Sequence, residues 1–377
     1  MAITTAAATQ RFTALDVFRG MTVCFMIIVN TPGNGATTFS PLLHAKWHGF
    51  TPTDLVFPSF LFAVGNALSF VMQRYRTMAQ GQVISKILKR VFIIFMLGYL
   101  MYWFPFVHYE QGQLVGNPIE NTRIFGVLQR IALAFGIAAL LIYFLQWRRA
   151  LVVSIIGLFV YWALLLIFGE PGAQLTLHGN AVLKLDNWLI GPSHLYMGEG
   201  VPFDPEGLLS TLPAIANVTA GFAAGYFLQK QGKNFEALAR LLLVGCVLLF
   251  IAYAWNLAFP INKKLWTSSF VVLTVAIDCI LLGMLVYVID LRHKTRWTYF
   301  FEVFGRNPLF IYLLSEVLAI LLYFFQSGEG SLYSAIYQKI FSPLGGYLGS
   351  LAFALSFMLL CWFVGYLLDK RKIYIRV

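Results

Sequence analysis

Long apolar segments separated by short polar loops constrain the fold of this chain more than any other feature. Hydrophobic residues make up 59% of its 377 residues and charged residues only 11%, which is more apolar surface than a soluble fold buries. A helix needs about 20 mostly apolar residues to cross a bilayer, because every backbone polar group in the hydrocarbon layer must be satisfied internally. The sequence therefore predicts an all-α fold, a polytopic membrane helix bundle.

The apolar segments number about ten when each is given the length that a span needs. Basic residues gather in every second loop, from Arg74 and Arg76 to the tail at Lys370. Because such loops stay on the cytoplasmic side, both termini are predicted to be cytoplasmic. This bias also explains the net charge of +11, so we predict no nucleic-acid partner. The predicted spans are 20–30 (or 15–30), 53–72, 91–105, 124–145, 150–168, 207–228, 241–258, 268–291, 309–325 and 347–368.

The stretch 169–206 lies between two predicted spans and is rich in Gly, Pro, Asn and His. It is too short for an independent domain and sits on the side away from the basic loops. We therefore expect a single transmembrane domain over residues 1–377, with residues 169–206 as a cap over its outer face.

Groups that can do chemistry crowd between the first two predicted spans. The sequence there reads LDVFRG at 15–20, an apolar run that ends at Asn30, HAKWHG at 44–49 and DLVFP at 54–58. His44, Trp47 and His48 thus lie between two membrane crossings, on the side away from the basic loops. This membrane face is where we expect the functional site.

Several blocks, in this order, resemble the transmembrane acyltransferase family of heparan-α-glucosaminide N-acetyltransferase and its bacterial relatives. They extend from the first predicted span to the loop before the eighth, so the resemblance covers most of the chain. The blocks are LDVFRG at 15–20, Asn30, His44-x-x-Trp47-x-Gly49, DLVFP at 54–58, GVLQR at 126–130, DPEGLL at 204–209, Asn262-Lys263 and Leu265-Trp266.

The resemblance implies an enzyme that moves an acetyl group from cytosolic acetyl-CoA to the amine of a glucosamine-type sugar at the outer face. It further implies a multi-pass protein of the bacterial inner membrane, in contact with membrane lipid, with its active-site loop in the periplasm. By the same resemblance the chain forms a homodimer and uses acetyl-CoA as co-substrate with no metal.

Three residues are the predicted catalytic groups. His44 occupies the position of the family's active-site histidine, and imidazole accepts protons near neutral pH. It either deprotonates the acceptor amine or carries the acetyl group itself. Asp54 would orient the imidazole or bind the incoming ammonium, although Asp is also favoured at a helix start. Asn30 would hold the acyl carbonyl or a sugar hydroxyl, with helix-end capping as the alternative reading.

The predicted substrate-binding residues lie in the outer loops. An amide, an amine and an indole suit a polyhydroxylated ring, and carboxylates suit a cationic amino sugar. For Asp204 and Glu206, a helix start is the competing reading. The set is Trp47, Asp204, Glu206, Asn262, Lys263 and Trp266.

Four arginines are predicted to bind the co-substrate, since guanidinium groups bind phosphates bidentately. Arg130 lies inside a predicted span, where a buried cation requires a partner or an anionic ligand. For Arg19 and Arg90 the positive-inside bias is an equal explanation. The fourth is Arg306.

Two other functions fit the same residues. A proton-coupled transporter of an amino sugar or peptide would use Asp54, Arg130, Asp278 and Glu316 along its path. A structural membrane subunit would have neither activity and would tolerate substitution of His44. Formation of N-acetyl product by detergent-purified protein, with no gradient, separates the enzyme from both.

Overall fold

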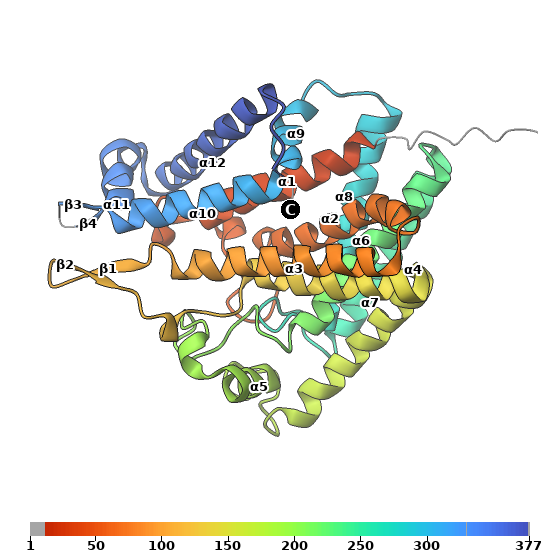
Figure 1. Ribbon diagram of the computed structural model, residues 1–377, viewed down its shortest axis with the longest axis horizontal. Helices are drawn as coiled ribbons and strands as arrows, with labels where there is room; N and C mark the ends of the chain where they lie inside the picture. The colour runs from red at the N-terminus through yellow and green to blue at the C-terminus, as the bar shows by residue number, and fades with distance from the viewer. Residues whose placement is uncertain (1–11, 329, 376–377) are drawn as a thin grey trace, which may run out of the picture.

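A computed structural model describes residues 12–328 and 330–375, and the described chain is a bundle of long helices (Figure 1). The helices are α1 (Thr13–Asn30), α2 (Pro52–Tyr75), α3 (Gln80–Trp103), α4 (Val127–Phe168), α5 (Ala181–Ile190), α6 (Thr211–Gln231), α7 (Phe235–Asn256), α8 (Ser268–Leu285), α9 (Thr298–Arg306), α10 (Pro308–Phe324), α11 (Leu332–Ile336) and α12 (Gly346–Lys370). Two antiparallel pairs, β1 (Val107–Glu110) with β2 (Gln113–Gly116) and β3 (Gln326–Ser327) with β4 (Gly330–Ser331), lie at one end of it.

Seven helices in the described residues are long and apolar enough to cross a membrane, namely α1, α2, α4, α6, α7, α8 with its π-helical continuation to Leu291, and α12. An eighth span results if α9 and α10, which meet at 83°, are counted together. The sequence predicted about ten spans. The difference has two causes: the segments 124–145 and 150–168 join in the single helix α4, and α3 carries Lys86, Lys89 and Arg90.

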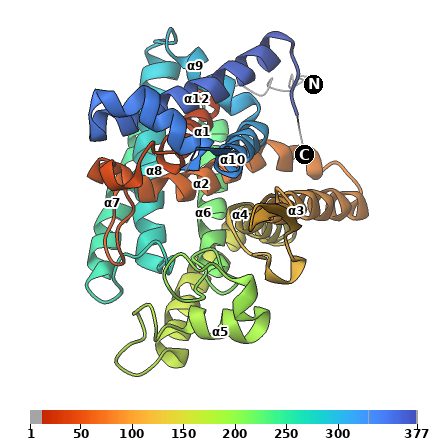
Figure 2. The ribbon, with the colours of Figure 1, turned by 90° about the vertical axis from the view of Figure 1, so that its left-hand side faces the viewer.

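The helix α4 changes direction at Gln146, whose φ of 65° and ψ of 157° are not helical. The bend lies at the end of the molecule opposite the two β hairpins (Figure 1). Beyond the bend, the second half of α4 leads to the stretch 169–206, which contains α5. Both views place α5 at the lower edge of the molecule (Figure 2). The two ends of the chain, residues 1–11 and 376–377, lie outside the described residues, so their predicted side is not observed.

The helix α6 packs against α2 and α4 in the middle of the bundle. A Cβ atom at Gly65 would lie 2.0 Å from the carbonyl oxygen of Val218, and one at Gly221 would lie 2.1 Å from that of Phe62. These distances are far below van der Waals contact, so only glycine permits the backbones of α2 and α6 to approach this closely. The contact fixes α2, which begins two residues before Asp54, against the centre of the bundle.

Candidate active site

A histidine and a buried aspartate form a hydrogen-bonded pair at the start of α2. The Nδ1 atom of His44 lies 2.7 Å from Oδ1 of Asp54. The carboxylate is 1% exposed and the imidazole 46% exposed. Because an ionised carboxylate can only accept, Nδ1 donates the hydrogen and Nε2 keeps its lone pair. The geometry leaves a basic nitrogen near solvent, backed by a buried negative charge.

Local sequence explains why Asp54 sits in this position. Thr51 and Asp54 form a capping box, in which Oδ2 of Asp54 accepts from the amide of Thr51 at 2.9 Å. The same oxygen accepts from the amide of Ala45 at 3.2 Å. Thr51 also donates to the carbonyl of Leu43 at 2.7 Å. The helix start and the histidine loop are therefore one hydrogen-bonded unit, so the two readings of Asp54, as cap and as partner of His44, hold together.

The loop between α7 and α8 lies over this pair. Nζ of Lys263 is 3.0 Å from Nδ1 and 3.1 Å from Nε2 of His44, and 4.0 Å from the carboxylate of Asp54. Burial lowers the pKa of the Lys263 amine, while Asp54 and Glu206 oppose this effect. Lys264 donates to the carbonyl of Lys46 at 2.8 Å. The structure thus brings His44, Asp54 and Lys263 together as the sequence predicted.

Three further predicted residues surround this pair with structural contacts. Asn262 is fully buried, accepts from the amide of Leu265 at 2.8 Å and lies 3.4 Å from Nδ1 of His48. The ring of Trp266 is 1% exposed and its indole donates to Asn217 at 3.1 Å. The indole of Trp47 donates to the carbonyl of Leu175 at 2.7 Å, which ties the histidine loop to the stretch 169–206.

A buried ionic cluster adjoins the site, with Arg123 at its centre. Its guanidinium binds Asp204 through two hydrogen bonds of 2.8 and 2.6 Å and Glu206 through one of 2.7 Å. Burial acts against the charge, but the hydrogen bonds that Arg123 donates to Asp204 hold the pKa of Arg123 above its usual value. Both predicted acidic residues are therefore paired within the protein. Arg123 was not among the residues predicted for the site, although a cation in a stretch predicted to lie outside ran against the charge bias.

Asp186 on α5 is a second residue that the sequence analysis did not single out. Its side chain is buried, Oδ1 accepts from the amide of Leu208 at 3.2 Å, and Oδ2 has no hydrogen-bond partner among the described residues. Burial and the neighbouring carboxylate of Asp204 raise the pKa of Asp186 to about 7. A solitary Asp in a polar stretch gives no signal in the sequence that it will be buried.

Arg130 belongs to this ionic cluster and lies apart from the other predicted arginines. It is fully buried, donates to Ser210 and to the carbonyl of Gly207, and lies 4.7 Å from the ring centroid of Trp266. Its Nε and Nη1 have no hydrogen-bond partner among the described residues. Arg130 therefore lies between the segment that carries Asp204 and Glu206 and the ring of Trp266.

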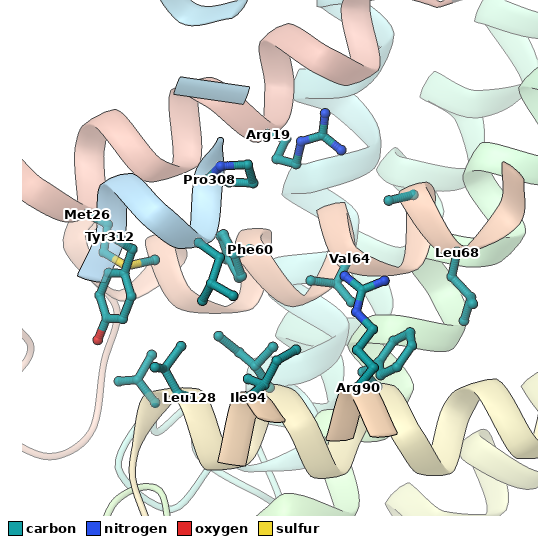
Figure 3. A pocket seen from close by; sticks show the side chains of 15 residues that line it. Arg19, Met26, Phe60, Val64, Leu68, Arg90, Ile94, Leu128, Pro308 and Tyr312 are labelled. Atoms are coloured by element: carbon teal, nitrogen blue, oxygen red, sulfur yellow. The ribbon is translucent and has the colours of Figure 1, made fainter. Parts of the chain in front are cut away.

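Arg19 and Arg90 face one cavity between α1, α2, α3, α4 and α10. Figure 3 shows Arg19 on one wall and Arg90 reaching in from the facing wall. Nε of Arg90 is buried with no hydrogen-bond partner among the described residues, and its guanidinium lies 4.7 Å from the ring centroid of Phe135. The remaining lining is apolar, apart from Tyr312. The cavity thus combines two cations with an apolar channel.

The last two predicted residues lie elsewhere. Arg306 binds Asp369 at 2.7 Å and Glu302 at 2.9 Å, and the lining of the cavity with Arg90 does not include it. Asn30 donates to Glu316 at 3.2 Å, and no contact between Asn30 and His44 is recorded in the described part of the chain. Within residues 12–328 and 330–375, no three His, Cys, Asp or Glu side chains are grouped as a metal site requires.

The apolar helices and the histidine–carboxylate pair together define a multi-pass membrane protein with an acid–base site at one end of its bundle. Residues 11–251 match the family model described as heparan-α-glucosaminide N-acetyltransferase, catalytic, and the chain belongs to this family. The matched segment contains His44, Asp54 and the cavity arginines, and it ends before Asn262.

Two curated relatives carry the same name. The heparan-α-glucosaminide N-acetyltransferase of Mus musculus is 28% identical over 367 residues, covering 83% of this chain and 54% of the relative. That of Homo sapiens is 28% identical over 366 residues, covering 82% and 53%. The chain thus spans about half the length of the curated relatives it matches.

Proposed function

We propose that this protein transfers an acetyl group from acetyl-CoA to the amine of a glucosamine-type sugar at the outer face of the membrane that it spans. One observation carries the proposal: the buried carboxylate of Asp54 holds Nδ1 of His44 at 2.7 Å, so that Nε2, which lies 3.1 Å from Nζ of Lys263, is the ring nitrogen that can accept a proton. The family to which the chain belongs, and the name that both relatives carry, support this reaction class.

The pair His44 and Asp54 supplies the acid–base step. Nε2 of His44 takes the proton that the acceptor amine loses when its nitrogen displaces the thiol from the thioester. Asp54 keeps the imidazole in the required tautomer and stabilises the imidazolium that forms. The same nitrogen would carry the acetyl group if transfer proceeds in two steps.

Lys263 supports the geometry of this step. Its primary amine already stands 3.1 Å from Nε2 of His44 and 4.0 Å from Asp54. An acceptor amine needs the same approach, so the site accommodates an amine nitrogen against the imidazole. Lys263 then moves aside to bind the hydroxyls of the acceptor.

The cavity between α1, α2, α3, α4 and α10 carries groups that suit parts of the donor, although its volume of about 100 Å³ requires the helices around it to move apart before the donor enters. Arg19 and Arg90 provide guanidinium groups for its phosphates, and the unpartnered Nε of Arg90 is a buried donor that such an oxygen would satisfy. The apolar lining, with Phe60, Ile94 and Ile131, suits the thioester arm. Arg306 is held by two carboxylates. Arg19 donates to Asp16 and to the carbonyl of Gly305, both at 2.8 Å, so we assign the phosphate contact first to Arg90, with Arg19 beside it.

The proposed topology has ten spans, with α3 and both halves of α4 each crossing the membrane and α9 with α10 counted as one. Both termini and the basic loops are cytoplasmic, and the His44 loop, capped by residues 169–206, faces the periplasm of a bacterial inner membrane, where the chain forms a homodimer. Its test is labelling of Gly35→Cys and Gly232→Cys with an impermeant thiol reagent in intact cells. A Cys246→Ser background removes the exposed native thiol. Reaction at position 232 alone would reverse the topology.

The function is tested with detergent-purified protein, labelled acetyl-CoA and glucosamine. Labelled N-acetylglucosamine formed without a gradient supports the transferase. Absence of product, with glucosamine uptake by reconstituted vesicles, would replace it with the transporter. Omitting the acceptor then separates the two chemical routes, because only a two-step transfer leaves label on His44.

A further inference from the structure

A second cavity lies far from the chemistry, where α4 bends and α6 ends. It measures about 370 Å³, the volume of roughly a dozen water molecules in the liquid. The bend of α4 that borders it is at the end of the bundle away from the β hairpins (Figure 1). Its lining consists of Gln146, Trp147, Arg148, Tyr226, Phe227, Lys230 and Gln231.

The floor of this cavity is fixed by the bend itself. The non-helical backbone at Gln146 turns the next residues out of the first half of α4. The rings of Trp147 and Tyr226 then pack with centroids 5.6 Å apart, and both rest on the buried cluster formed by α2, α3, α4 and α6. The cavity is therefore a shaped feature of the fold, with amphipathic aromatic rings where two apolar helical segments end.

The charges around this cavity are unbalanced. The guanidinium of Arg148 lies 5.5 Å from the ring centroid of Trp147, and Lys230 is in the last turn of α6. Neither has an acidic partner in the part of the chain that the structure describes. Of the other cations nearby, Lys233 binds Asp290 at 2.9 Å and Arg240 binds Glu236 at 2.5 Å. Two cations and two glutamine amides thus converge on a cavity that lacks an anion.

We propose that this cavity binds the phosphate headgroup of an anionic phospholipid from the adjoining leaflet. Arg and Lys bind phosphate oxygens, and basic pockets between membrane helices are suited to anionic headgroups. The aromatic rings belong at the depth where acyl chains meet headgroups. A soluble phosphate offers the same oxygens, but it makes no use of the apolar flank formed by Phe227 and Tyr226.

The test is lipid binding to the full chain in detergent, followed by native mass spectrometry. Phosphatidylglycerol is titrated against the parent chain, the double variant Arg148→Gln/Lys230→Gln, and the control Arg371→Gln/Lys372→Gln. The control removes the same charge from the exposed tail. We expect the double variant to lose affinity by about thirty-fold and the single variant Lys230→Gln by about fivefold. The control should change by less than twofold.

Three outcomes would overturn the proposal. An equal loss in the control variant would show a general charge effect. Equal binding of phosphatidylcholine would show that the cavity does not select the anionic headgroup. Displacement of the lipid by millimolar glycerol phosphate would assign the site to a soluble phosphate. Should the double variant aggregate, Lys230→Gln decides the question, because its side chain is exposed on a helix end. No readout depends on acetyl transfer, so failure of the proposed function leaves this test intact.

Discussion

The histidine site and the arginine cavity differ in whether their buried charged groups have partners within the protein. At the histidine site, Asp54 receives hydrogen bonds from His44, Thr51 and Ala45, and the adjoining Asp204 and Glu206 are both bound by Arg123. In the cavity, Arg90 has a buried Nε with no partner in the described residues, among mostly apolar side chains. The first region is organised before any substrate arrives, whereas the second keeps a buried donor for which we propose an anionic ligand.

Replacing His44 tests the organised region with the largest expected effect. His44→Ala should lower acetyl transfer by about 10²- to 10⁴-fold, the usual contribution of a general base. Acetyl-CoA affinity should stay unchanged, because the imidazole lies in a different region from Arg90. Product formation and binding are measured on the same preparation, with His108→Ala, an exposed histidine of β1, as the control. A variant that retains most of its turnover would exclude both roles of His44 and make Asp54 the next candidate base.

Arg130 tests whether the organised region extends behind the histidine. Arg130→Ala should lower the free energy of unfolding by about 3 to 5 kcal/mol, because it removes a buried cation from beside Glu206, Asp204 and Asp186. The midpoint of thermal unfolding in detergent measures this change. Arg149→Ala, an exposed arginine on the same helix, is the control. An unchanged midpoint together with weakened acetyl-CoA binding would show that Arg130 binds the co-substrate, like Arg90, and does not stabilise the histidine site.

The buried Asp186 makes stability depend on pH. Its pKa of about 7, against an ordinary 3.8, means that the folded state binds this proton more tightly. Stability from the protonated carboxyl is complete below about pH 4 and is lost as the pH rises to about 7, a loss of about 4 kcal/mol.

Thermal unfolding at pH 5 and pH 8 measures the part of this loss that falls between these two values, about 3 kcal/mol. Asp186→Asn should remove much of the difference between the two midpoints. Glu170→Gln, an exposed carboxyl in the same stretch that pairs with Lys184 at 3.5 Å, should keep it. The same difference in parent and Asp186→Asn would show that Asp186 is ionised throughout.

Replacing Arg90 tests the arginine cavity, and its expected effect is the smallest of the four. Arg90→Gln should weaken acetyl-CoA binding by about 10- to 100-fold, the value of one or two charge-assisted hydrogen bonds. The midpoint of unfolding should hold or rise, because a buried cation is removed. Titration of labelled acetyl-CoA measures the affinity, and Lys89→Gln, the exposed neighbour on α3, is the control. An equal loss of acetyl-CoA affinity in both variants would show that the effect comes from the change in net charge and not from a contact of Arg90.

The parts of this structure that sequence predicted are those set by local rules. Apolar runs predicted the positions of the long helices. The family blocks placed His44, Asp54 and Lys263 in one site, and these side chains lie close together in the structure, while their roles stay predictions. The connection between 145 and 150 was predicted as a loop because of its arginines. The chain instead stays helical on both sides of Gln146, where no Gly or Pro marks the bend. Arg123 and Asp186 were missed because their burial depends on how distant segments meet.

The glycine contact between α2 and α6 also decides where movement is available. With backbones this close, α2 cannot slide or roll on α6 without collision, so the pair that carries Asp54 is the stationary part of the bundle. The opposite wall of the arginine cavity is formed by Pro308, Leu309 and Tyr312 at the start of α10, directly after the 83° break from α9. The wall of the cavity that can change shape is therefore the start of α10, and a substitution there would alter the cavity without displacing Asp54 from His44.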